Sequence, residues 1–139
     1  MNWLYSLKIS SVQIAFKRSS ILNKRVRFDE RLGAGTNNGA GEETKFVYDC
    51  FKKVLCVYYY PAYISRLNES ESTWFRGYNS KYFTDKAKVL KYIYGKFFSC
   101  LYGLYFLVSK YKLYHDSISF FTAFKLFYVA IFDNRNNIR

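Results

Sequence analysis

The clearest hydrophobic pattern lies in the C-terminal third of the chain. Six large apolar residues recur there at intervals of three or four, the period of one helix face. They are Leu90, Ile93, Phe97, Leu101, Leu104 and Val108. Ser99 and Gly103 continue the less apolar side of this helix, and a turn is expected over 111–116. The next segment, 117–132, holds a single charge, Lys125. The pattern predicts a hairpin of two antiparallel helices within residues 84–132.

A second amphipathic helix is predicted over residues 45–60, where apolar residues again follow helical spacing and lysines fall largely opposite. Thr44 is a candidate cap for its start. Pro61 disfavours helix at the residue before it, so the helix should end near Tyr60.

The chain before this helix divides into two parts. Residues 29–44 contain four of the seven glycines and are predicted to form a flexible linker. Residues 1–28 contain no Asp or Glu and form a basic N-terminal segment. Three interpretations of that segment stay open: a mitochondrial targeting sequence, a basic arm, or a folded element such as a short strand through Val12, Ile14 and Phe16. The predicted fold class is mainly α, with an aromatic helical domain over 45–139.

The content of aromatic and charged residues limits the classes of partner that the protein is expected to bind. The chain has 15 Tyr, 14 Phe and a formal net charge of +12, with 22 Lys and Arg against 10 acids. Aromatic rings favour a core, a lipid interface or stacking on bases. A strongly positive protein attracts polyanions, either nucleic acid or an anionic bilayer.

The residues that carry most enzyme chemistry are scarce. The one histidine, His115, lies beside Asp116 without a nucleophile elbow, and the three cysteines have no metal-ligand spacing. Gly33 and Gly35 begin a dinucleotide fingerprint, but Asn38 stands where its third glycine belongs. We therefore expect a non-enzymatic protein with no cofactor and no small-molecule substrate.

The first functional hypothesis is association with an organellar, specifically mitochondrial, membrane, with the role of an accessory subunit in a larger assembly as one form of it. Neither hairpin segment is a convincing span, because the uncharged run over 97–109 is short and Lys125 would be costly to insert. An interfacial or partly inserted hairpin is preferred over the alternative of a soluble core. The expected contacts with lipid phosphates are Lys88, Lys91, Lys96, Lys110 and Lys112.

The alternative is a structural protein that binds RNA, such as a component of an organellar ribosome. Its expected RNA contacts are Lys17, Arg18, Lys24, Arg25, Arg27, Trp74, Arg76 and Lys81. A third hypothesis is an AT-rich open reading frame with no selected function, since AT-rich codons specify Tyr, Phe, Lys and Asn.

Overall fold

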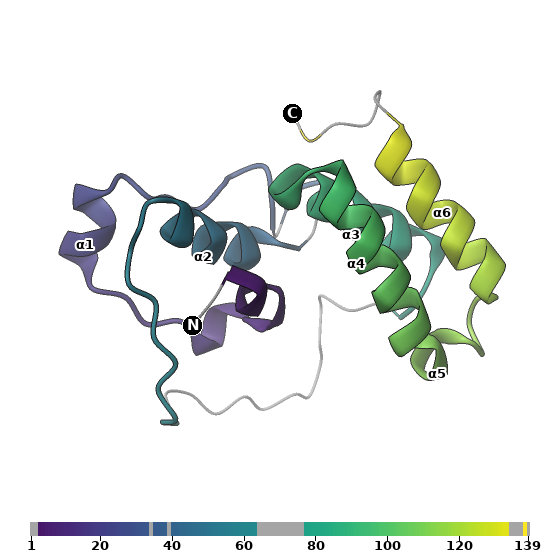
Figure 1. Ribbon diagram of the computed structural model, residues 1–139, viewed down its shortest axis with the longest axis horizontal. Coiled ribbons are helices and arrows are strands. Elements are labelled where there is room, and N and C mark those ends of the chain that lie inside the picture. The colour runs from purple at the N-terminus through teal and green to yellow at the C-terminus, as the bar shows by residue number, and fades with distance from the viewer. Residues whose placement is uncertain (1–2, 34, 39, 64–76, 134–137, 139) are drawn as a thin grey trace.

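A computed structural model describes residues 3–33, 35–38, 40–63, 77–133 and 138. The protein is mainly helical, as the sequence predicts, and the described part of the chain contains no strand (Figure 1). The 3-10 helices are η1 (Trp3–Lys8) and η2 (Ser11–Gln13). The α-helices are α1 (Arg18–Asn23), α2 (Glu42–Lys52), α3 (Ser80–Tyr94), α4 (Lys96–Ser109), α5 (Tyr111–Tyr114) and α6 (Phe120–Phe132).

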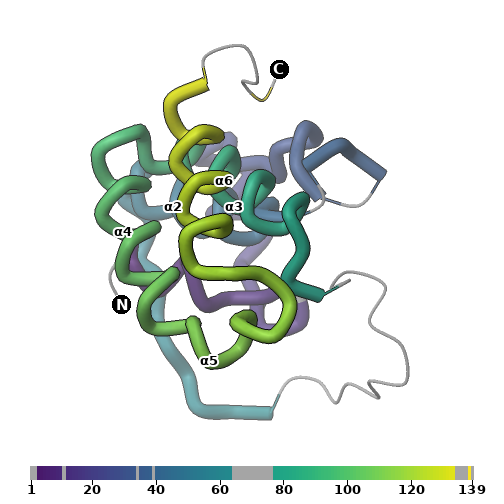
Figure 2. The backbone as a smooth tube through the Cα atoms, turned by 90° about the vertical axis from the view of Figure 1, so that its right-hand side faces the viewer, coloured from purple at the N-terminus to yellow at the C-terminus, as the bar shows by residue number. Residues whose placement is uncertain are grey.

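The C-terminal part contains the predicted helical pair, but its first helix is divided in two. Gly95, with φ +82°, separates α3 from α4 and lets the chain reverse in a single residue. The ring centres of Phe83 and Phe106, which are far apart in sequence, lie 6.5 Å from one another, so α3 and α4 run antiparallel. Helix α6 then returns along α4, where the Tyr128 hydroxyl donates to the carbonyl of Cys100 at 2.7 Å. The two-helix hairpin predicted over 84–132 is therefore a bundle of three helices, closed at one end by α5 (Figure 2).

The core of this bundle is aromatic and tightly packed. Phe83, Phe127 and Tyr114 are fully buried, and the Tyr114 hydroxyl donates to the carbonyl of Leu107 at 2.8 Å. Its donor is therefore satisfied inside an otherwise apolar environment, which avoids the cost of an unpaired buried hydroxyl.

Helix α4 packs on the face opposite to the predicted one. Ser99 and Gly103, expected on the outer side, are buried. The predicted apolar stripe is buried only before Gly95; its last four members, all on α4, are exposed. These are Phe97, Leu101, Leu104 and Val108. The physical reason is a close approach between α4 and α6, since a Cβ on Gly103 would lie 2.4 Å from Cε1 of Phe127.

The N-terminal part folds onto α2 and onto the bundle. Helix η1 packs on α2, and Trp3 contacts the rings of Tyr48, Tyr94 and Phe98. Ser6 is fully buried, and its hydroxyl lies 2.5 Å from that of Tyr94. The residues 12–16 do not form a strand, so that interpretation is wrong. No other described segment pairs with residues 12–16 as a strand. Instead, Ile9, Ile14 and Ile21 pack around Phe46 and Val47.

The glycine-rich stretch forms hydrogen-bonded turns in its described residues. Leu32 is buried against Val89 and Ile93 of α3, and Asp29 bridges Arg31 and Tyr92. The flexibility of this stretch stays a prediction. Helix α2 begins at Glu42, before the predicted cap Thr44, and ends at Lys52 rather than near Tyr60.

We expect Gly103→Ala to lower the free energy of unfolding by up to about 2 kcal/mol, measured by urea denaturation. Alanine favours helix by about 1 kcal/mol, but overpacking against Phe127 costs about 1–3 kcal/mol. Adding Phe127→Leu should recover part of the loss, because it opens the same contact. A single variant more stable than the parent would contradict this packing.

Asp29 should make stability depend on acid pH. The hydrogen bond from Arg31, and secondarily that from Tyr92, holds the pKa of the Asp29 carboxyl well below its usual range. A carboxyl with a lowered pKa stabilises the fold above its ordinary pKa near 4, and this is lost as the pH falls. We expect Asp29→Asn to destabilise by about 1–3 kcal/mol at pH 7. The gap from the parent should narrow steadily below about pH 4, whereas the exposed Asp116→Asn should change little.

Candidate functional site

Several of the most exposed phenylalanine, leucine and valine side chains lie on α4 and α6. On α4 they form one stripe down the helix, in which Phe97 is 81% and Leu101 58% exposed. On α6 the outward residues include Phe121, which is 83% exposed. We call this surface the α4/α6 apolar face and define it as Phe97, Leu101, Leu104, Val108, Phe121 and Phe132. Contiguous exposed apolar surface of this kind usually marks an interaction site.

The two helices contribute neighbouring parts of this face. The bond between Tyr128 and Cys100 marks the line along which α6 and α4 meet. Leu101 and Leu104 lie one and four residues after Cys100, which places them just outside this line on α4. On α6, Phe121 lies seven residues before Tyr128 and Phe132 four residues after it, so both are on the side of the helix next to this line. Figure 2 shows the two helices side by side.

Positive charge surrounds the α4/α6 apolar face. Between residues 96 and 132 the chain holds four lysines and a single acid, Asp116. Lys96 begins α4, Lys110 follows its last residue, Lys112 lies on α5 and Lys125 on the exposed side of α6. None of the helices of the described residues is both long enough and apolar enough to cross a bilayer.

The structure does not bring the five predicted lipid-contacting lysines to one surface. Lys96, Lys110 and Lys112 are exposed near the two ends of α4. Lys88 and Lys91 are half-buried on α3, and the Lys91 ammonium donates to the carbonyl of Asp133 at 2.9 Å. Because α3 and α4 are separate helices, the helical period that related these lysines in the sequence is reset at Gly95.

Sequence reasoning missed Lys86 and Lys125. The Lys86 ammonium lies 4.7 Å from the ring centre of Phe106 and 5.8 Å from that of Tyr82. Burial, and to a lesser extent the nearby charge of Lys110, lowers the pKa of Lys86. The helical spacing of Lys86 places it on the inner side of α3. This signal was overlooked because a lysine usually faces water. Lys125 was noted only as a cost of insertion, although it borders the exposed face of α6.

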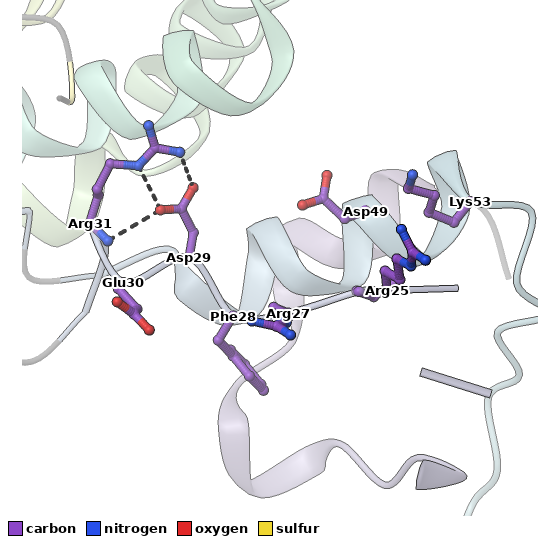
Figure 3. A pocket seen from close by; sticks show the side chains of 9 residues that line it. Arg25, Arg27, Phe28, Asp29, Glu30, Arg31, Asp49 and Lys53 are labelled. Atoms are coloured by element: carbon purple, nitrogen blue, oxygen red, sulfur yellow. Dashed lines mark hydrogen bonds and ion pairs between the residues drawn. The ribbon is translucent and has the colours of Figure 1, made fainter. Parts of the chain in front are cut away.

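A second charged surface lies at the opposite end of the molecule, where α1 and α2 end. An open pocket of about 550 Å³ is lined there by nine residues, including Arg25, Arg27 and Lys53. Figure 3 shows Arg25 and Lys53 near one another, with the Asp29–Arg31 pair at the other end of the pocket. We call Arg25, Arg27 and Lys53 the basic cluster.

The predicted RNA contacts separate into three groups. Five are exposed on α1 or beside it and remain together: Lys17, Arg18, Lys24, Arg25 and Arg27. Lys81 lies on α3, where it pairs with Asp85 and donates to the carbonyl of Asn37 at 3.3 Å. Trp74 and Arg76 lie outside the described residues. Lys53 was missed, because only the fold brings the end of α2 to the loop after α1.

In the part of the chain that the structure describes, no three His, Cys, Asp or Glu side chains are grouped to hold a metal ion. No protein-family model, curated protein or solved structure matches this chain.

Replacing Lys86 by Met should leave the protein at least as stable as the parent in thermal unfolding at neutral pH. Burial lowers the pKa of Lys86, and removing an ammonium from water costs more than contacts with the rings of Tyr82 and Phe106 return. Methionine has a similar length and fills the same space without a charge. A loss of about 1 kcal/mol or more would show that the cation–π contacts dominate.

Proposed function

We propose that the protein binds the surface of an anionic membrane through the α4/α6 apolar face. The observation that carries the proposal is that α4 leaves four large apolar side chains in water, while Ser99 and Gly103 are buried on its inner side beside Phe106 and Leu107. A face of this kind is stabilised by any environment that removes it from water.

A lipid interface suits the shape of this face. Helix α4 has 14 residues and is therefore about 21 Å long, which suits a helix lying in the plane of the interface rather than across it. Phe97 and Tyr105 add aromatic rings at the depth of the headgroups.

The charge around the face favours an anionic bilayer. Lys96, Lys110, Lys112 and Lys125 surround apolar side chains that would enter the acyl region, and long lysine stems let their ammonium groups reach the phosphates. Each lysine near such a surface contributes about 1 kcal/mol. A second copy of the chain is a poorer occupant, because two faces bordered by lysines would repel one another.

The cellular setting extends the proposal. The absence of acids from residues 1–28 favours an organelle that imports basic segments, such as the mitochondrion. A membrane-bound accessory subunit without enzymatic activity is consistent with two binding surfaces. The packing of Ser6 and Val26 favours retention of this segment in the folded protein, since both are buried.

The test is co-flotation of the full chain with vesicles of phosphatidylcholine containing phosphatidylglycerol. We expect binding at low salt, partial release at high salt, and much weaker binding to phosphatidylcholine alone. Phe97→Ser with Leu101→Ser should weaken binding at least about tenfold, because two large side chains no longer leave water.

The matched control is Tyr58→Ser with Tyr59→Ser, which removes two equally exposed rings from another part of the molecule. Equal binding by the two double variants would refute the proposed face. A stable dimer in buffer that dissociates on Phe97→Ser would assign the face to a second copy of the chain instead.

A further inference from the structure

We infer that the end of the molecule formed by α1, α2 and residues 53–63 binds single-stranded nucleic acid, with the basic cluster on phosphates and the exposed tyrosines on bases. This site lies at the other end of the molecule from the α4/α6 apolar face (Figure 1). The inference is therefore independent of the proposed membrane function.

Two helix ends place the basic cluster. Arg25, two residues after the end of α1, has φ +51°, and Val54, two residues after the end of α2, has φ +57°. In both, the next amide reaches back to the last turn: Val26 N to Ile21 O at 3.1 Å, and Leu55 N to Cys50 O at 2.9 Å. Both are Schellman motifs with their usual apolar contact. They fix the chain direction at Arg25 and just after Lys53, so both cations border one pocket.

The acids that line the pocket do not neutralise the basic cluster, because two of the three are paired with other cations. Of the three acids on its lining, Asp29 is held by Arg31 at 2.8 Å and Asp49 by Lys45. Glu30 remains, and Figure 3 shows it on the side of Arg31. Within the described residues, the side chains of Arg25, Arg27 and Lys53 have no hydrogen-bond or ion-pair partner. Three free cations against one free carboxylate make this a site for anions.

The surroundings of the pocket carry the same sign of charge. Residues 3–28 and 50–63 together hold eight Lys and Arg and no Asp or Glu. A run of cations of this extent follows a polymer of phosphates better than a single phosphate group.

Aromatic side chains lie in the same segment, directly after Lys53. Tyr58, Tyr59 and Tyr60 are each about 80% exposed, and Tyr63 is fully exposed. The residues just before them, Leu55 and Val57, pack on the cluster around Phe46, which anchors the start of this extended segment. Exposed rings beside a cationic surface are the combination that proteins use for single strands, because bases stack on the rings while phosphates meet the cations.

A lipid surface explains this end less well than a single strand. The tyrosines follow one another in an extended segment rather than on one helix face. The α4/α6 apolar face lies at the other end of the molecule, so one flat bilayer surface would not contact both that face and the tyrosines (Figure 1).

The test uses the full chain and a fluorescent oligouridylate of about 20 nucleotides, followed by anisotropy at several salt concentrations. We expect affinity to fall steeply with salt. Arg25→Gln with Arg27→Gln should reduce affinity and lower the slope of log affinity against log salt by about 1.4. Tyr58→Ala with Tyr59→Ala should reduce affinity about tenfold or more.

Matched controls come from the other end of the molecule. Lys110→Gln with Lys112→Gln removes the same charge, and Phe97→Ala with Leu101→Ala removes apolar side chains of similar exposure; both should bind the oligonucleotide like the parent. Circular dichroism should show that all variants retain the parent's helicity.

Three results would overturn the inference. One is no binding at low salt. Another is unchanged affinity in the tyrosine variant, together with equally tight binding to heparin, which would reveal attraction to polyanions alone. The third is displacement of the oligonucleotide by anionic vesicles that still bind the Phe97→Ala, Leu101→Ala variant, which would assign this end to lipid.

Discussion

The close approach of α4 and α6 at Gly103 is the contact on which the rest of the structure depends. Phe127 occupies the space that any side chain on Gly103 would need, so small residues of α4 must face inward. Since α4 is apolar on nearly every side, turning one apolar face inward leaves another in water. The exposed stripe is thus a consequence of how the core is packed, and the hydrophobic effect makes that stripe the natural place for a partner.

The N-terminal part is joined to this bundle by polar and aromatic contacts. Asp29, Arg31 and Tyr92 connect the glycine-rich turns to α3, while Trp3 packs on rings from α2, α3 and α4. These contacts hold the basic cluster away from the α4/α6 apolar face. The protein therefore presents an exposed apolar face at one end and the basic cluster at the other.

Much of the fold could be predicted from the sequence, but its boundaries could not. The apolar period located α2, α6 and one helix where the structure has α3 and α4, because burial of one helix face requires that spacing. The helix starts could not be fixed, since several Ser, Thr, Asp and Asn residues lie near the beginning of α3 and of α6, and only packing selects among them. Asn79 and Ser119 cap α3 and α6, where nearby alternatives were equally plausible. Arg25 and Arg27 were among the residues named from the sequence, whereas Lys53 and the exposed stripe on α4 emerged only from the fold.

The amino-acid sequence by itself determined that the chain is helical, basic and rich in aromatic residues, because composition and period are local properties. The tertiary structure decided which way each helix faces. A continuous period across Gly95 concealed a chain reversal, since glycine permits a positive φ without any change in the hydrophobic pattern. Only the fit of Phe127 against Gly103 shows that the stripe of Phe97, Leu101, Leu104 and Val108 remains outside. Only the fold at the ends of α1 and α2 brings Arg25 and Lys53 to one pocket.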